Sequence, residues 1–394
     1  MLDAAFLRLW TGMTASGLAT WALPFILGLA VLDKTLSPAA LGVVLATRTI
    51  GFLVAVPVGG VLADRYSRRA VVLWSGLIAA GASPVIAVGS VPLMAVAAAV
   101  VGVGQGACRP AFQALVAEVV TVERRQRANA AMTLSVRVTT LVAPGLTALL
   151  ATVVDTGWLL AGTGLLWLVA ALLPPAGSAE PAAQATRPRL VSEFTEGVRE
   201  ARRHPWFMAG LGALAAVIFT GYSATGVALP LLSGSEAVLA AALTAYTAGA
   251  LAGALIIARW RPKRQGWAAL AGLACYGFAP LSLLVDLGPA VVVAAYVLTG
   301  IGIELFNVPW FTATQREVRP ELLARVSSLD FLVSYGLAPL GLALIAPAID
   351  AYGTTAVLAG CAVICFAAPA VAAVVPSSRH FGRSLESSGE PRRR

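Results

Sequence analysis

The stretch Gly59–Arg69, GGVLADRYSRR, places two glycines and four charged residues directly after a long apolar run. That run, Pro38–Val58, has Arg48 as its one charge, and the stretch itself holds Asp64 beside three arginines within six positions. Small residues such as the glycines let helix backbones approach closely. The pattern predicts a membrane-spanning helix that ends in a charged loop at the membrane surface.

The composition places most of the chain in lipid. Of 394 residues, 58% are hydrophobic and only 12% are charged, and the mean hydropathy is +0.83. A soluble domain would carry about a quarter charged residues. A bilayer must therefore act as the solvent for much of this surface. The N-terminal segment MLDAAFLRLW lacks a basic region and a small-residue cleavage site, so we expect the first span to stay attached.

Apolar runs and the breakers between them predict twelve membrane-spanning helices, and hence an all-α membrane protein. Each meets or approaches the ~20 residues that cross ~30 Å of hydrocarbon. The expected spans cover residues 6–31, 38–63, 70–90, 92–119, 129–154, 157–174, 206–232, 236–258, 267–285, 289–315, 325–349 and 354–376.

The basic residues predict the orientation of these spans. Of 28 lysines and arginines, 24 lie in the termini and in alternate loops, three lie within spans, and only Lys34 lies in the opposite loops. Because basic loops stay in the cytoplasm, we expect both termini there. No basic stripe is interleaved with aromatic residues, which argues against a nucleic-acid partner.

Most catalytic chemistries lack their residues in this chain. The two histidines lie in polar segments, and no span carries a metal cluster or a nucleophile with its base. Nothing resembles a nucleotide-binding loop, so we expect no cofactor, no metal and no enzymatic activity. The four cysteines are expected to be buried free thiols: Cys108, Cys275, Cys361 and Cys365.

A linker divides the chain. Its first part, PPAGSAEPAAQATRPR, is rich in proline and alanine and predicts a flexible connection. The following LVSEFTEGVREARRHPW places Leu190, Phe194 and Val198 on one helix face, which favours a helix on the cytoplasmic membrane surface; the alternative is a solvated helix. The expected divisions are 1–174 and 206–376 as six-helix halves, 175–205 as the linker, and 377–394 as a cytoplasmic tail.

The two halves share sequence. Val142–Asp155, VAPGLTALLATVVD, matches Leu337–Asp350, LAPLGLALIAPAID, at an offset of 195. The first and seventh spans both end on ALP, and a basic exit follows both the second and the eighth. Duplication would give the parallel repeat of many secondary transporters, with substrate near the midplane. The alternative is chance similarity between helices rich in alanine and leucine.

The motif Gly60-x-x-x-Asp64-Arg65-x-x-Arg68-Arg69 resembles the loop between spans two and three of the major facilitator superfamily. Phe306–Gly341, RPAFQAL and RRHPW resemble its bacterial drug-efflux branch, the macrolide and siderophore exporters. The resemblance implies a transporter of the bacterial cytoplasmic (inner) membrane, functional as a monomer, that exports amphipathic small molecules such as drugs by proton antiport. Ser67 stands where that loop usually has glycine.

Other functions stay open. The span-four arginine that antiporters of this superfamily often carry is Gly102 here, and their span-five motif is reduced to Ala143-Pro144-Gly145. Uptake or facilitated transport of a metabolite without protons is therefore an alternative. A membrane sensor or scaffold on the same fold is another.

The charged loop predicts a gate on the cytoplasmic side. Asp64 at a helix end can face the positive N-terminus of a neighbouring helix, and the resemblance implies that this helix is span eleven. Arg68 or Arg69 would pair with Glu118, and such a latch would favour the outward-open state. The alternative is that these arginines only set topology. The gating loop comprises Gly60, Asp64, Arg65, Arg68, Arg69 and Glu118.

Charges within the spans are the candidates for coupling, because each costs at least ~2.5 kcal/mol on insertion scales. Glu304, near the middle of span ten, is the expected proton-titrating group, with Asp330 as a second candidate nearer the rim. The alternative role for Glu304 is a structural ion pair. The candidate charge partners are Arg48, Arg109 and Arg137.

Polar and aromatic residues in three spans predict a cavity. Such side chains around one acid suit an amphipathic ligand, cations included. If the fold holds, spans one and seven face each other across it. The candidates are Thr14, Thr20 and Trp21 in span one, Tyr222 and Thr225 in span seven, and Asn307 and Trp310 in span ten.

Overall fold

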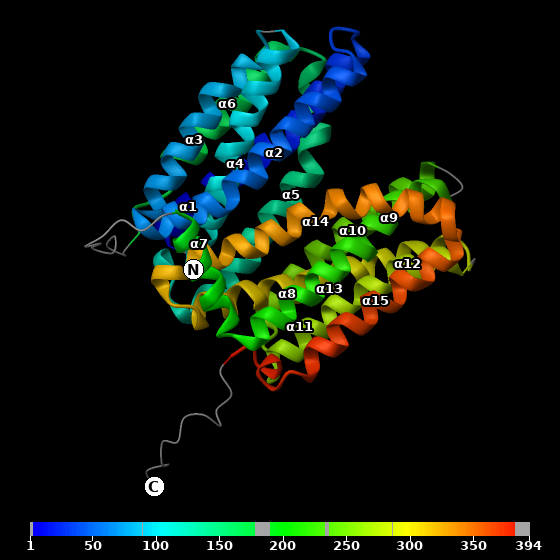
Figure 1. Cartoon of the computed structure of the whole chain (residues 1–394). Coiled ribbons are helices and arrows are strands. Elements are labelled where there is room, and N and C mark those ends of the chain that lie inside the picture. The colour runs from blue at the N-terminus through cyan, green and yellow to red at the C-terminus, as the bar shows by residue number, and fades with distance from the viewer. Residues whose placement is uncertain (1–2, 89, 178–189, 233–235, 286, 383–394) are drawn as a thin grey trace. The chain divides into compact units, whose positions relative to one another are not determined.

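The computed structural model (Figure 1) describes residues 3–88, 90–177, 190–232, 236–285 and 287–382. Its regular structure within these ranges is helical. The chain divides into two compact units. Unit 1 comprises Met1–Val198 and Arg319–Leu332, and unit 2 comprises Arg199–Val318 and Val333–Arg394.

Unit 1 contains six long helices and two short ones. The contacts run from α5 through α1, α6, α3 and α4 to α2. The first turns of α14 also belong to this unit. The helices are α1 (Ala4–Leu32), α2 (Pro38–Arg65), α3 (Arg68–Val85), α4 (Val91–Val119), η1 (Val122–Arg124), α5 (Arg125–Ala151), α6 (Thr156–Leu172), η4 (Pro320–Leu322) and the start of α14 (Leu323–Tyr352).

Unit 2 contains the remaining helices. Within it α13 packs on α10 and α11, and α15 packs on α8 and α11 (Figure 1). The helix α7 (Leu190–Arg202) passes from unit 1 into unit 2. The others are α8 (Pro205–Val217), η2 (Ile218–Tyr222), α9 (Ser223–Leu232), α10 (Glu236–Arg259), α11 (Gln265–Ala274), η3 (Cys275–Gly277), α12 (Phe278–Leu284), α13 (Pro289–Glu317), α15 (Thr354–Val374) and η5 (Pro376–Arg379).

The twelve predicted spans are confirmed as twelve helical segments in the described ranges. Ten of these are long and apolar enough to cross a membrane. The α6 helix is apolar but shorter, and α3 begins with two arginines, which lowers its hydropathy. Spans seven and nine are not regular α-helices, because the π-turn η2 interrupts one and the 3₁₀ turn η3 the other.

Side-chain caps explain where several helices of unit 1 begin. Asp3 accepts a 2.9 Å hydrogen bond from the Phe6 N–H at the start of α1. Ser37 accepts one from Ala40 at 3.2 Å, and Ser67 one from Ala70 at 3.3 Å. These caps satisfy amide groups that a helix leaves unpaired at its N-terminus. Ser67, where glycine was expected from the resemblance, thus starts α3.

Glycines bring two pairs of helices into backbone contact. A methyl group at Gly51 of α2 would overlap the Ala99 carbonyl of α4, and one at Gly102 would overlap the Arg48 carbonyl. In unit 2, Gly249 and Gly300 meet the carbonyls of Val297 and Tyr246 in the same way. All four residues of the second set lie 198 positions after their counterparts. This shared register supports the duplication.

The linker and tail are described only in part. Residues 178–189 of the linker and 383–394 of the tail lie outside the described residues. The described end of the tail turns back onto unit 2, where Phe381 is 1% exposed. Arg316 of α13 donates hydrogen bonds to the carbonyls of His380 and Phe381, at 3.4 and 3.1 Å. The segment after α15 is therefore part of the packed structure.

Candidate functional site

The end of α2 is joined to the start of α14 by Asp64. Its Oδ1 accepts a 3.1 Å hydrogen bond from the Ala324 N–H, and its Oδ2 accepts a 2.9 Å bond from the Arg325 N–H. Both amides lie in the first turn of α14, where the helix dipole is positive. The carboxylate thus occupies the position expected of it, at the N-terminus of span eleven. All three residues belong to unit 1.

Gly60 makes this approach possible. It lies one turn before Asp64 on the same face of α2. A Cβ at this position would lie 2.7 Å from the Ala324 carbonyl oxygen and 2.8 Å from the Ser328 Cβ. Any side chain would push α2 and α14 apart. The glycine of the motif therefore sets the distance that the Asp64 hydrogen bonds require.

Arg68 holds three groups at once. Its guanidinium pairs with Glu118 at the end of α4, lies 3.4 Å from Asp64, and donates to the Pro320 carbonyl of η4. The side chain is only 5% exposed. Arg68 is thus the arginine that pairs with Glu118. Arg69 instead donates to the Leu172 carbonyl at the end of α6, at 3.2 Å.

Two acids of α7 complete a set of ion pairs around Arg325. Glu193 and Glu196 lie 3.0 and 2.8 Å from the Arg325 guanidinium, and Glu193 also lies 3.4 Å from Arg65. Glu193 is 2% exposed, whereas Glu196 is 48% exposed. We call the whole set the charge network: Asp64, Arg65, Arg68, Glu118, Glu193, Glu196 and Arg325.

Sequence reasoning missed Glu193, Glu196 and Arg325 as members of this network. The expected feature of this segment was its apolar face, yet Phe194 and Val198 are only half-buried, while Glu193 is buried. Gly197 faces α14 as well, where a Cβ would lie 2.7 Å from the Arg325 Cβ. The available signal was an acid pair three residues apart on a helix otherwise rich in arginine.

The charged centre of unit 1 lies at Arg48. Its guanidinium donates to the Gln105 side chain of α4 at 2.8 Å and to the Thr20 carbonyl of α1 at 3.1 Å. Gln105 was not among the expected site residues, although its side chain anchors the arginine. Arg109 is buried and Arg137 is half-buried.

The span-one candidates mostly bond within unit 1. The hydroxyls of Thr14 and Ser135 are 2.6 Å apart, so α1 and α5 are joined there. Thr20 donates to the Ser16 carbonyl one turn earlier. The Trp21 indole N–H is buried, with no hydrogen-bond partner among the described residues.

The candidates of unit 2 lie in different surroundings. Glu304 on α13 is fully buried, and Asn307 one turn later is half-buried. Thr225 is buried and donates to the Gly221 carbonyl at 2.9 Å, while Tyr222 is 47% exposed. Asp330, on the part of α14 that belongs to unit 1, is 4% exposed.

Trp310 does not line a cavity as expected. Its ring stacks on Phe207 at 4.8 Å and on Phe306 at 5.2 Å between centroids, with Trp206 and Phe381 at 5.5 and 5.6 Å. It is 1% exposed. The sequence prediction failed here because its aromatic partners come from α8 and the tail, far away in the chain. Trp310 belongs to the core of unit 2.

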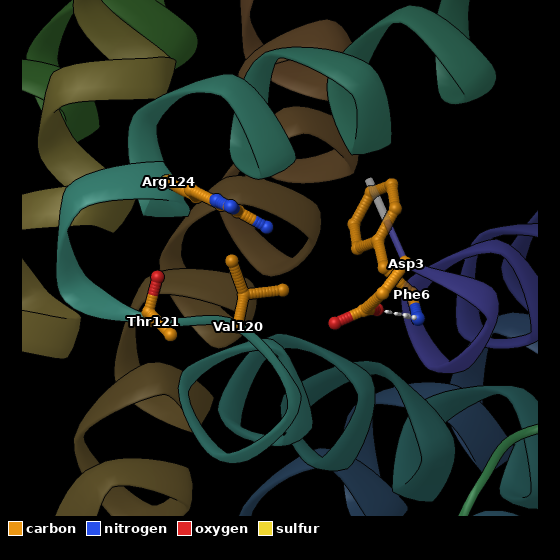
Figure 2. A pocket seen from close by; sticks show the side chains of 5 residues that line it. All are labelled: Asp3, Phe6, Val120, Thr121 and Arg124. Carbon is orange, nitrogen blue, oxygen red and sulfur yellow. Dashed lines mark hydrogen bonds between the residues drawn. The ribbon is translucent and has the colours of Figure 1, made fainter. Parts of the chain in front are cut away.

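One small pocket lies in unit 1 beside the start of α1 (Figure 2). Asp3, Phe6, Val120, Thr121 and Arg124 line it. The dashed line in Figure 2 is the cap bond from the Phe6 N–H to the Asp3 carboxylate. Because that acid already caps α1, the pocket offers a poor site for a ligand. Among the described residues, no group of three or more metal-binding side chains is found.

Comparison with known proteins defines the class. The family model described as Major Facilitator Superfamily matches residues 9–342, and the chain belongs to that superfamily. It is therefore a multi-pass membrane transporter of small molecules. No curated protein matches the sequence significantly.

Two solved structures share the fold. The human organic anion transporter MFSD10 (TETRAN) matches with a TM-score of 0.77 at 15% identity, over 94% of this chain and 99% of that one. The proton:xylose symporter XylE, bound to 6-bromo-6-deoxy-D-glucose, matches with a TM-score of 0.67 at 12% identity, over 94% of both chains. At these identities the likeness concerns the fold alone.

Proposed function

We propose that this transporter exports amphipathic small molecules by proton antiport with alternating access. It would act as a monomer in the bacterial cytoplasmic membrane, with both termini in the cytoplasm. The distribution of basic residues supports the orientation. Transport of an organic anion and proton-coupled transport both occur among the proteins that share its fold.

The charge network is the observation that carries alternating access. It closes the basic ends of α2, α4 and α14 with bonds that use charged groups, each worth about 1.5–3 kcal/mol. Moving a two-state equilibrium from 1:99 to 99:1 takes about 5.5 kcal/mol. A few such bonds therefore suffice to favour the outward-open state, and their loss to favour the inward-open one.

Glu304 is the proposed proton carrier. A carboxylate buried within a span is costly when charged, and protonation removes that cost. Coupling follows if the acid takes a proton from one side and releases it to the other. Asp330 is the second candidate, and Arg48, Arg109 and Arg137 are the proposed charge partners within the membrane.

The test uses energised inverted vesicles and a pH-sensitive dye. Lipophilic cations and antibiotics are added to wild type, to Glu304→Gln and to Glu123→Gln, which changes an exposed acid as the control. We expect substrates to dissipate the gradient with wild type and control but not with Glu304→Gln. Dissipation by all three would return Glu304 to a structural role. Transport of labelled compounds without any dissipation would favour facilitated transport, and no transport would favour a sensor or scaffold.

A further inference from the structure

Four of the seven tyrosines lie together in unit 2. They come from four separate segments of the chain: Tyr222 from η2, Tyr246 from α10, Tyr276 from η3 and Tyr296 from α13. The rings of Tyr246 and Tyr276 meet edge to face, with 6.5 Å between centroids. We call these four residues and Thr225 the tyrosine cluster.

The hydroxyl groups of the cluster converge on one place. Those of Tyr222, Tyr246 and Tyr296 lie near enough to that of Tyr276 to interact with it electrostatically. Tyr276 and Tyr296 both lie close to the Thr225 side chain. Thr225 uses its own proton on the Gly221 carbonyl at 2.9 Å, so it offers the cluster only an acceptor.

Tyr296 carries a hydroxyl group without a partner. The residue is 5% exposed, and its hydroxyl oxygen is buried with no atom at hydrogen-bond distance among the described residues. Leaving such a group unsatisfied costs about 1–3 kcal/mol. Buried polar groups in native proteins nearly always have partners, so this exception calls for a function. A ligand acceptor beside Tyr296 would remove the cost.

The π-turn η2 makes room for the cluster. A Cβ at Gly221 would lie 2.9 Å from the Tyr276 ring and 2.5 Å from the Cys365 Sγ. The absence of a side chain at Gly221 therefore lets Tyr276 reach this position. Single π-turns within α-helices are frequent at functional sites.

The duplication gives the cluster a counterpart in unit 1. Tyr246 lies 198 positions after Arg48, and each contributes the carbonyl that meets a glycine of the neighbouring helix. The centre of unit 1 is thus built on a guanidinium held by Gln105, whereas that of unit 2 is built on neutral phenols. A duplicated fold has here acquired two different chemistries.

We propose that the tyrosine cluster binds uncharged, oxygen-rich amphipathic molecules. Phenol O–H groups donate to carbonyl, ester and ether oxygens, and the rings provide apolar contact area for the rest of the ligand. None of the five side chains carries a charge, so the cluster offers no ion pair to a charged ligand. The proposal rests on the proposed export of amphipathic molecules and specifies the ligand class.

Binding to the purified full-length protein tests it, with two radiolabelled probes. Hydrocortisone is uncharged and oxygen-rich, and tetraphenylphosphonium is a cation without oxygen. We expect Tyr296→Phe to weaken hydrocortisone binding about tenfold and to leave tetraphenylphosphonium binding unchanged. Tyr352→Phe, which removes a phenol oxygen from a residue 77% exposed, is the matched control and should bind both probes as wild type does.

Thermal unfolding of the free protein provides an independent readout. Because the Tyr296 hydroxyl is unsatisfied, its removal should leave the unfolding temperature unchanged or raise it. A lower unfolding temperature with unchanged hydrocortisone binding would identify a structural hydroxyl and overturn the proposal. Failure of hydrocortisone to bind wild type would also overturn it.

The two proposals fail separately. Equal binding of hydrocortisone by wild type and Tyr296→Phe removes the site but leaves the vesicle result standing. Absence of antiport with a Tyr296-dependent binding loss removes proton-driven export but keeps the site. A second variant, Gly221→Ala, should also weaken hydrocortisone binding, because the added methyl group displaces the Tyr276 ring.

Discussion

The carboxylate of Asp64 accepts a 2.9 Å hydrogen bond from the backbone N–H of Arg325, a residue 261 positions away in the chain. Its other oxygen accepts from Ala324, so one side chain caps α14 with both of its oxygens. The Arg325 side chain then turns to the two acids of α7. A single turn of α14 thus joins α2 to the linker helix within unit 1.

Asp64→Asn should lower both the unfolding temperature and the transport rate. Asparagine has one acceptor oxygen, so one of the two amides loses its partner, and the negative charge facing the helix N-terminus is lost. We expect a loss of about 1–3 kcal/mol in stability. The check is thermal unfolding in detergent together with transport in proteoliposomes.

Asp155→Asn provides the control for that variant. Asp155 stands at the N-cap of α6 but makes no side-chain cap hydrogen bond. It should therefore change little in either assay. Equal losses from the two substitutions would mean that any acid at a helix end contributes as much as Asp64.

Arg68→Lys should impair the protein, whereas Arg69→Lys should not. The Arg68 guanidinium contacts Glu118, Asp64 and the Pro320 carbonyl together, and a lysine ammonium cannot match that geometry. Arg69 makes one bond to a carbonyl at the edge of the unit. We expect a severalfold lower transport rate for Arg68→Lys at normal expression. Equal rates for the two variants would reduce both arginines to topology signals.

The sequence was sufficient for elements that follow from local composition. The twelve spans follow from apolar length, and the contact of Asp64 with span eleven follows from an acid at a helix end and the family resemblance. The pairing of Arg68 with Glu118 was one of two choices, because both arginines leave the same turn.

Residues brought together by packing were harder to predict. Glu193 and Arg325 are 132 positions apart, and nothing local in either segment identifies the other. Trp310 was misplaced because an aromatic residue beside Glu304 and Asn307 looked like a cavity residue, whereas its neighbours come from α8 and the tail. The tyrosine cluster likewise depends on a π-turn that apolar periodicity does not predict.

Glu193→Gln should cost more stability than Glu196→Gln. Both acids contact Arg325, but Glu193 is 2% exposed and Glu196 is 48% exposed. Breaking a buried ion pair costs about 3–5 kcal/mol, whereas an exposed pair is worth about 0–1 kcal/mol. Thermal unfolding of the two variants at equal salt measures the difference. A larger loss from Glu196→Gln would show that burial does not decide the strength of these pairs.

Phe381→Ala should destabilise unit 2. The Phe381 ring lies 5.3 Å from that of Trp206 and 5.6 Å from that of Trp310, and the residue is 1% exposed. Truncating a buried phenylalanine costs about 3–5 kcal/mol, so the unfolding temperature in detergent should fall clearly. Phe25→Ala, at a residue 49% exposed, is the control and should change it little. An unchanged unfolding temperature in Phe381→Ala would mean that the segment after α15 contributes no packing energy, and that the aromatic core around Trp310 is stable without it.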